Sequence, residues 1–331
     1  MTSSALLQAV ESFYGIGRCD VVTSPRPWSS SLCWKLRDSH GDYFVLKEKP
    51  RSQDKDEFNF HLGLHQFLWA EKGPVVRLLS SHHEPILEHG HRYFELQAWF
   101  VGRHFKTSTS DSCALGRLAA EFDKLARDYQ STHQGDWQFP RYRHSYFPDR
   151  SLSDWKQVME RIGGRLWSAK RETNEISRWL DGHLEPSHTK SWEEIPQQFL
   201  HGDIDYDNAK RNSSRSVLLD LENARWGYRL TEIARACAVI GSFDRGSAGQ
   251  IVMRRELDSG NVRSFIRGYD SVSRLTETEN LLLSDFIGLN LVATFASCFC
   301  MDKPSFSQSH LQLQSQRLTA TLKTVDRLDL D

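Results

Sequence analysis

The chain has 331 residues, which suits one large domain or two lobes sharing a cleft and excludes a single small core. Hydrophobic residues make up 39% and charged residues 26%, while Lys plus Arg (42) nearly equals Asp plus Glu (43). With a formal net charge of -1, this balance gives no electrostatic basis for nucleic acid or an anionic membrane as the main partner.

The longest apolar region runs from 286 to 301 and is interrupted by Asn290, Thr294 and Ser297, so we expect a buried helix there and no membrane span. The first residues lack the basic start and long apolar run of a signal peptide. The six cysteines form no C-x-x-C pair, which predicts neither a zinc site nor a disulfide framework. We therefore expect a cytoplasmic protein.

The first hundred residues alternate between strand and helix patterns. The predicted elements are a helix at 5–15, a hairpin of strands 31–36 and 43–47, a helix over 58–68, and strands at 85–87 and 93–96. The order strand, strand, helix, strand, strand describes a small sheet that carries one helix.

After Gly102 the pattern becomes mainly helical. Apolar residues from Leu115 to Tyr129 recur at helical spacing, and Ser110-Asp111 is the expected cap of that helix. Further helices are predicted at 151–182 (with a break near Gly163-Gly164), 230–242, 261–270, 276–300 and 307–327, and two short strands within 198–220. These patterns predict a first lobe at 1–97, a linker at 98–103 and a second lobe at 104–331.

The segment from His201 to Asn208 carries the chemistry. It reads H-G-D-I-D-Y-D-N, and an apolar strand ending at Asp220 follows a turn at 212–215. Phosphoryl transfer needs a carboxylate beside the attacking hydroxyl, here Asp203 as the base. It also needs oxygen ligands for Mg²⁺, here Asn208 and Asp220. The set therefore predicts a phosphotransferase.

The pattern H-G-D-x-x-x-x-N, followed by an apolar strand and D-x-E, resembles the aminoglycoside phosphotransferase and choline kinase family, which also includes type II homoserine kinases. The resemblance covers about residues 20–300. It implies an α+β, protein-kinase-like fold, in which a small lobe of antiparallel sheet precedes a larger, mainly helical lobe.

The resemblance also implies roles upstream of the motif. Lys47 would pair with the α- and β-phosphates of ATP, and Glu57 would orient that lysine. Backbone groups of Gln97, Ala98 and Trp99 would bind adenine. The expected cofactors are ATP and Mg²⁺, and the expected partner is a small molecule that accepts the phosphoryl group on a hydroxyl.

The sequence departs from the family pattern in three places. The nucleotide loop at 24–31 contains no glycine, Gly227-Tyr228-Arg229 replaces a frequent G-D-P turn, and Glu232 stands where an Asp is frequent. A non-catalytic nucleotide-binding protein and a protein or peptide kinase therefore remain alternatives. The short interval from Leu221 to Gly227 leaves no clear activation segment and favours a small acceptor.

The class of acceptor stays open at this level. A cationic acceptor would need clustered carboxylates, and an anionic one would need arginines. The candidates are Asp205, Asp207 and Glu222 for the first, and Arg141, Arg143, Arg225 and Arg229 for the second.

Overall fold

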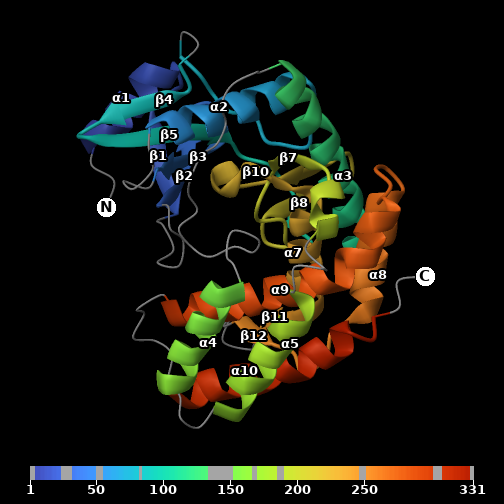
Figure 1. Ribbon diagram of the computed structural model, residues 1–331. Helices are drawn as coiled ribbons and strands as arrows, with labels where there is room; N and C mark the ends of the chain where they lie inside the picture. The colour runs from blue at the N-terminus through green and yellow to red at the C-terminus, as the bar shows by residue number, and fades with distance from the viewer. Residues whose placement is uncertain are drawn as a thin grey trace. The chain divides into compact units, whose positions relative to one another are not determined.

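The computed structural model describes residues 4–23, 32–49, 55–81, 84–132, 152–165, 170–184, 190–245, 251–300 and 308–328 (Figure 1). The chain forms two compact units. The first contains Met1–Arg103 together with Lys210–Glu222, and the second contains His104–Ala209 together with Asn223–Asp331. The segment Lys210–Glu222 thus packs with residues that precede it by more than a hundred positions.

The first unit is built on a five-stranded antiparallel sheet in the order β1-β2-β3-β5-β4. Its elements are α1 (Ser4–Tyr14), β1 (Cys19–Thr23), β2 (Cys33–Asp38), β3 (Tyr43–Glu48), α2 (Lys55–Ala70), β4 (Ile86–His89) and β5 (Arg92–Ala98). The predicted helix at the start, the hairpin and the later strands are confirmed. The β4–β5 turn places Gly90 and His91 at φ 59° and 58°, as a tight hairpin turn requires.

The two faces of this sheet differ in character because side chains alternate along a strand. One face packs against α1 through an apolar cluster that includes Val10, Leu36, Leu46 and Phe94. The opposite face carries Lys35, Val45, Lys47, Glu95 and Gln97, which sit in register with one another across β2, β3 and β5. The polar residues are therefore gathered on the face that α1 does not cover.

A further hairpin lies almost entirely in the first unit. It consists of β8 (Ala209–Arg211) and β9 (Ser216–Leu218), and the Asn212 side chain accepts the N–H groups of Ser214 and Arg215 in its turn, as expected. The Leu218 N–H donates to the Pro74 carbonyl at 2.7 Å, and Val217 is buried against Val76 and Phe100. These contacts fix the strand that leads to Asp220.

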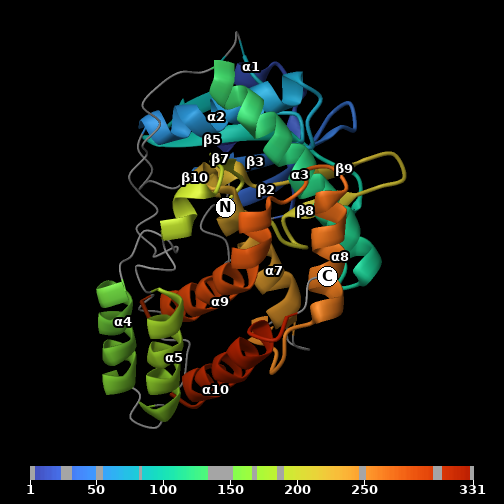
Figure 2. The ribbon, with the colours of Figure 1, turned by 45° about the vertical axis from the view of Figure 1, so that its right-hand side comes forward.

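The second unit is mainly helical (Figure 2). Its elements are α3 (Thr109–Thr132), α4 (Leu152–Arg165), α5 (Lys170–His183), β7 (Gln197–Leu200), β10 (Arg225–Tyr228), α7 (Arg229–Ser242), β11 (Phe243–Arg245), β12 (Ile251–Met253), α8 (Ser259–Asp270), α9 (Glu277–Cys300) and α10 (Gln308–Val325). The backbones of α3 and α8 approach closely, since a Cβ on Gly116 would lie 2.0 Å from the Phe265 carbonyl oxygen. Helix α7 is buried along most of its length.

Three details differ from the sequence-based expectations. Ser108 caps α3 by accepting the Asp111 N–H at 3.2 Å, so the cap lies before Ser110-Asp111. Gly163 and Gly164 lie inside α4, which ends at Arg165. Strands β10, β11 and β12 were not predicted, because segments of three or four residues carry too little periodicity.

Helix α9 contains the long apolar segment, and its described side chains from Phe286 to Ala293 are almost all buried. Within the ranges that the structure describes, no helix combines the length and apolarity needed to cross a bilayer.

Candidate active site

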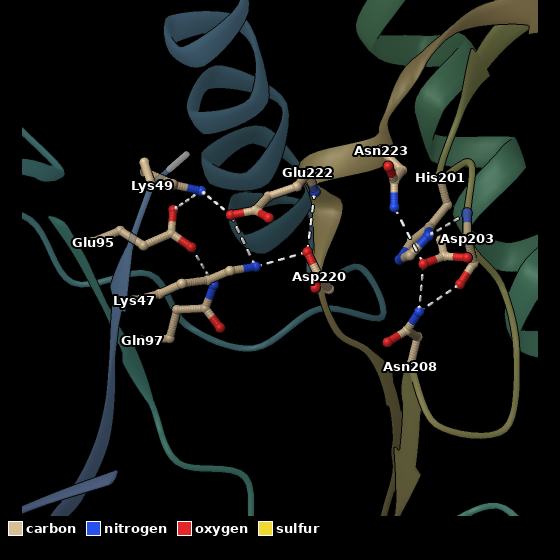
Figure 3. A network of polar contacts seen from close by, with 10 residues as sticks. All are labelled: Lys47, Lys49, Glu95, Gln97, His201, Asp203, Asn208, Asp220, Glu222 and Asn223. Atoms are coloured by element: carbon tan, nitrogen blue, oxygen red, sulfur yellow. Dashed lines mark hydrogen bonds and ion pairs between the residues drawn. The ribbon is translucent and has the colours of Figure 1, made fainter. Parts of the chain in front are cut away.

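Lys47 on β3 is the centre of a buried ion-pair network in the first unit (Figure 3). Its Nζ donates to Asp220 Oδ1 at 2.7 Å and lies 3.1 Å from Glu222 Oε1. Burial alone would lower the pKa of Lys47, but Asp220, Glu222 and Glu95 outweigh it and raise that pKa well above its usual value. Lys47 therefore stays charged at neutral pH.

Lys49 is a second buried lysine in this network, and sequence reasoning missed it. Its Nζ lies 2.6 Å from Glu95 Oε2 and 3.6 Å from Glu222 Oε1. The signal was present, because residues two apart on a strand face the same side. Burial would raise the pKa of Glu95, but Lys49 and Lys47 hold it below its ordinary value. Figure 3 shows Glu222 between the two lysines.

We call these residues the lysine half-site: Lys47, Lys49, Glu95, Gln97, Asp220 and Glu222. Its three carboxylates exceed its two ammonium groups by one negative charge. Asp220 has a left-handed backbone (φ 63°), and Lys47 lowers the pKa of its carboxyl to about 2 against the opposing effect of burial. Asp220 Oδ2 takes no hydrogen-bond partner among the described residues, so the half-site offers one carboxylate oxygen.

Glu57 is placed by the sequence as the partner of Lys47. The structure puts it in the first turn of α2, and its side chain lies outside the described residues. The partners of Lys47 that the structure does describe are Asp220 and Glu222. The role of Glu57 stays a prediction.

The backbone at the end of β5 is the segment that the sequence predicts to bind adenine. The Ala98 N–H donates to the Arg77 carbonyl and the Trp99 N–H donates to the Tyr43 carbonyl, both at 2.9 Å. Gln97 is paired with Val45, and its side-chain amide donates to Glu95 Oε1 at 2.8 Å. These three N–H groups are therefore already bonded within the first unit, and the part of this backbone segment in adenine binding stays a prediction. After Trp99, the next two backbone N–H groups, those of Phe100 and Val101, have no partner among the described residues.

In the second unit, the loop from His201 to Asn208 holds Asp203 from several sides. Asp203 Oδ2 accepts Asn208 Nδ2 at 2.9 Å and Asn223 Nδ2 at 3.2 Å, and its Oδ1 is paired with Arg235 on α7. Asn208 Nδ2 also donates to the Asp203 carbonyl at 2.9 Å. This fixed orientation is what a carboxylate that aligns a reacting hydroxyl needs.

Glu232 anchors the backbone of the same loop. This buried residue accepts the His201 N–H at 2.8 Å and also the Gly202 N–H. Arg235, one turn further along α7, donates from Nε to the Gly202 carbonyl at 2.9 Å. Asp is frequent in the family at this position. Here the longer side chain of Glu232 binds two backbone N–H groups.

Gly202 and His201 are fixed by packing. Gly202 has φ 80°, and a Cβ there would lie 2.1 Å from the Asn223 carbonyl oxygen. His201 is fully buried, and its ring meets Phe122 edge-on with centroids 5.5 Å apart. We call this set the loop half-site: His201, Gly202, Asp203, Asn208, Asn223, Glu232 and Arg235. The sequence identified Asp203 and Asn208, whereas the contacts of Asn223 and Arg235 required the structure.

One arginine considered for an anionic acceptor is occupied elsewhere. Arg229 is buried, donates from Nε to Glu279 Oε1 at 2.8 Å and from Nη1 to Ser273 Oγ at 3.0 Å. It therefore holds α7 to α9. Arg141 and Arg143 lie outside the described residues.

Comparison with known proteins shows the family of this chain. The family model described as "Phosphotransferase enzyme family" matches residues 25–271. The chain belongs to this family. No curated protein sequence matches the chain.

Solved structures of several small-molecule kinases are similar in fold to this chain. An amicoumacin kinase in complex with AMP-PNP and Ca²⁺ is 12% identical with a TM-score of 0.67, covering 99% of this chain and 98% of its own. A microcompartment-associated aminopropanol kinase is 15% identical with a TM-score of 0.67 and 99% coverage of both chains. Choline kinase from Cryptosporidium parvum Iowa II is 13% identical with a TM-score of 0.57, covering 96% of this chain and 90% of its own. At such low identity these similarities establish the α+β kinase-like fold alone.

Proposed function

We propose that the chain is an ATP- and Mg²⁺-dependent phosphotransferase that transfers the γ-phosphoryl group to a hydroxyl of a small molecule. The observation that carries the proposal is the fixed carboxylate of Asp203, held by Asn208, Asn223 and Arg235 in a loop that Glu232 anchors. The lysine half-site supports it, because Lys47 is buried, charged and paired with Asp220.

In this proposal each residue acts by position and charge. Asp203 orients the acceptor hydroxyl toward the γ-phosphorus and takes its proton as the new O–P bond forms and the bond to ADP breaks. Lys47 neutralises phosphate oxygens, and at least part of its pairing with Asp220 is exchanged for contacts with them. The backbone around Gln97 to Trp99 contacts the base, together with the N–H groups of Phe100 and Val101, which have no partner among the described residues.

Asn208 and Asp220 each offer an oxygen of the kind that a magnesium ion prefers. Asn208 Oδ1 and Asp220 Oδ2 each lack a hydrogen-bond partner among the described residues, and the lysine half-site carries an excess negative charge. Mg²⁺ in phosphotransferases is held by one or two such protein oxygens together with the substrate phosphates. When bound, the ion would neutralise charge that develops on the phosphate oxygens.

The test is ADP release from Mg-ATP against a panel of hydroxyl acceptors that spans aminoglycosides, amino alcohols, choline-like amines, sugars and nucleosides. We expect one class to stimulate ADP release, and Asp203→Asn to lower that rate by about 10²–10⁴-fold while nucleotide binding persists. Asp20→Asn makes the same charge change on an exposed strand residue and serves as the control. Near-normal turnover by Asp203→Asn would show that Asp203 is not the base.

A further inference from the structure

The sheet face that carries Lys47 also carries Lys35, one row of paired residues closer to Trp99. Cys33, Lys47 and Glu95 form one row across β2, β3 and β5, and Lys35, Val45 and Gln97 form the next. Strands rise about 3.3 Å per residue, so these rows lie about 6.6 Å apart. Trp99 follows Gln97 by two residues.

Two lysines from different strands meet at the indole of Trp99. Lys35 Nζ on β2 lies 4.1 Å from the ring centroid, and Lys210 Nζ on β8 lies 4.2 Å from it. Lys35 Nζ is also 4.4 Å from the centroid of Tyr43. Lys210 is only 9% exposed, and Lys35 is half-buried. All four residues belong to the first unit.

Neither lysine forms an ion pair with a carboxylate in the part of the chain that the structure describes. Burial and then the charge of Lys35 lower the pKa of Lys210. The indole ring attracts both cations, but it offers their N–H groups no oxygen or nitrogen acceptor. A buried lysine without an acidic partner is rare, and a ligand that offers acceptors would complete this arrangement.

The position of these lysines relative to a nucleotide rests on the proposed function. If Lys47 binds phosphate oxygens, the ribose separates them from the base, and the base lies further along the same face toward Trp99. That places it beside the Lys35–Val45–Gln97 row and the N–H groups of Phe100 and Val101. The two ammonium groups are then neighbours of the base edge.

A lysine ammonium donates hydrogen bonds and accepts none. Guanine presents two adjacent acceptors, N7 and O6, whereas adenine presents the N7 acceptor beside an N6 amino donor. We propose that Lys35 and Lys210 are base-selecting residues, and that this chain uses GTP as a phosphoryl donor at least as readily as ATP. Both lysines would turn from the Trp99 ring to the guanine edge.

The experiment measures the Kd values of non-hydrolysable GTP and ATP analogues for the full chain by calorimetry with Mg²⁺. The variants are Lys210→Met and Lys35→Met, which keep the aliphatic stem and remove the ammonium. Lys72→Met removes a charge from an exposed residue of the same unit and is the matched control. A single lost contact to guanine should raise the Kd of the GTP analogue about tenfold, with the ATP analogue changed less.

Tighter or equal binding of the GTP analogue by the wild type, lost selectively in either lysine variant and retained in Lys72→Met, is the expected result. Wild-type binding of the ATP analogue more than tenfold tighter than the GTP analogue would overturn the inference and leave the proposed function intact. So would equal weakening of both analogues in both variants. Binding of neither analogue by a folded wild-type chain would overturn the proposed function itself, and the inference with it.

Discussion

Gly202→Ala tests how strictly the loop around Asp203 is held. Gly202 has φ 80°, a conformation that costs an L-residue about 1–2 kcal/mol. The new Cβ would lie 2.1 Å from the Asn223 carbonyl oxygen, whereas real Cβ contacts stay beyond 3.0 Å. The backbone must therefore shift by about 0.9 Å, the difference between these distances.

That shift acts on the groups that hold Asp203. The Gly202 N–H and carbonyl are bound by Glu232 and Arg235, and Asn223 donates to Asp203. A misplacement of about 1 Å can lower a catalysed rate about 10²-fold, so we expect that loss in kcat for the acceptor identified by ADP release. The thermal midpoint should also fall.

The control for this prediction is Gly182→Ala in α5, where a Cβ meets no atom within 4 Å. It should leave kcat unchanged and stabilise the helix slightly. If Gly202→Ala keeps kcat within about threefold of wild type, the reasoning that a rigid loop positions Asp203 is refuted.

Two further predictions concern groups that hold the second unit. Glu232→Gln replaces one acceptor oxygen by a donor that faces the N–H groups of His201 and Gly202. We expect the free energy of unfolding to fall by about 2 kcal/mol, the thermal midpoint to fall by about 4–8 °C, and kcat to decrease. An unchanged midpoint would contradict the anchoring role of Glu232. Asp258 caps α8 by accepting the Asn261 N–H at 3.0 Å, so Asp258→Ala should cost about 1 kcal/mol at neutral pH, and Asp258→Asn less. Burial would raise the pKa of Asp258, but the hydrogen bonds of Asn261 and Arg254 hold that pKa below its ordinary value. The stability that Asp258 contributes is therefore present above about pH 4 and is lost as pH falls through the folded-state pKa. Equal acid sensitivity of wild type and Asp258→Asn in thermal melts would argue against this pH dependence.

Buried polar contacts hold the helices of the second unit to one another. Tyr269 on α8 donates to Asp123 Oδ2 on α3 at 2.5 Å, and burial, followed by the charge of Glu232, raises the pKa of Asp123 well above its ordinary value. Arg229 joins α7 to α9 through Glu279. Buried polar groups thus join α3 to α8, and α9 to the helix that carries Glu232 and Arg235.

The sequence alone determined the elements with strong periodicity and the chemistry of the motif. The alternation of β2 and β3, the apolar stripe of α3 and the spacing from Asp203 to Asn208 are local properties, which the order of residues encodes directly. Short motifs are local as well, so the sequence was enough to indicate the family resemblance.

The tertiary structure decided which distant residues meet. Asp220 pairs with Lys47 from 173 positions earlier in the chain, and Arg235 reaches Asp203 from a helix whose pattern indicates only burial. Which backbone N–H groups at the end of β5 are already bonded also required the structure, because the donation of Trp99 to Tyr43 depends on strand register. The meeting of Lys35 and Lys210 at Trp99 is likewise set by three strands that pack in one unit, and packing over such separations leaves no periodic trace in the sequence.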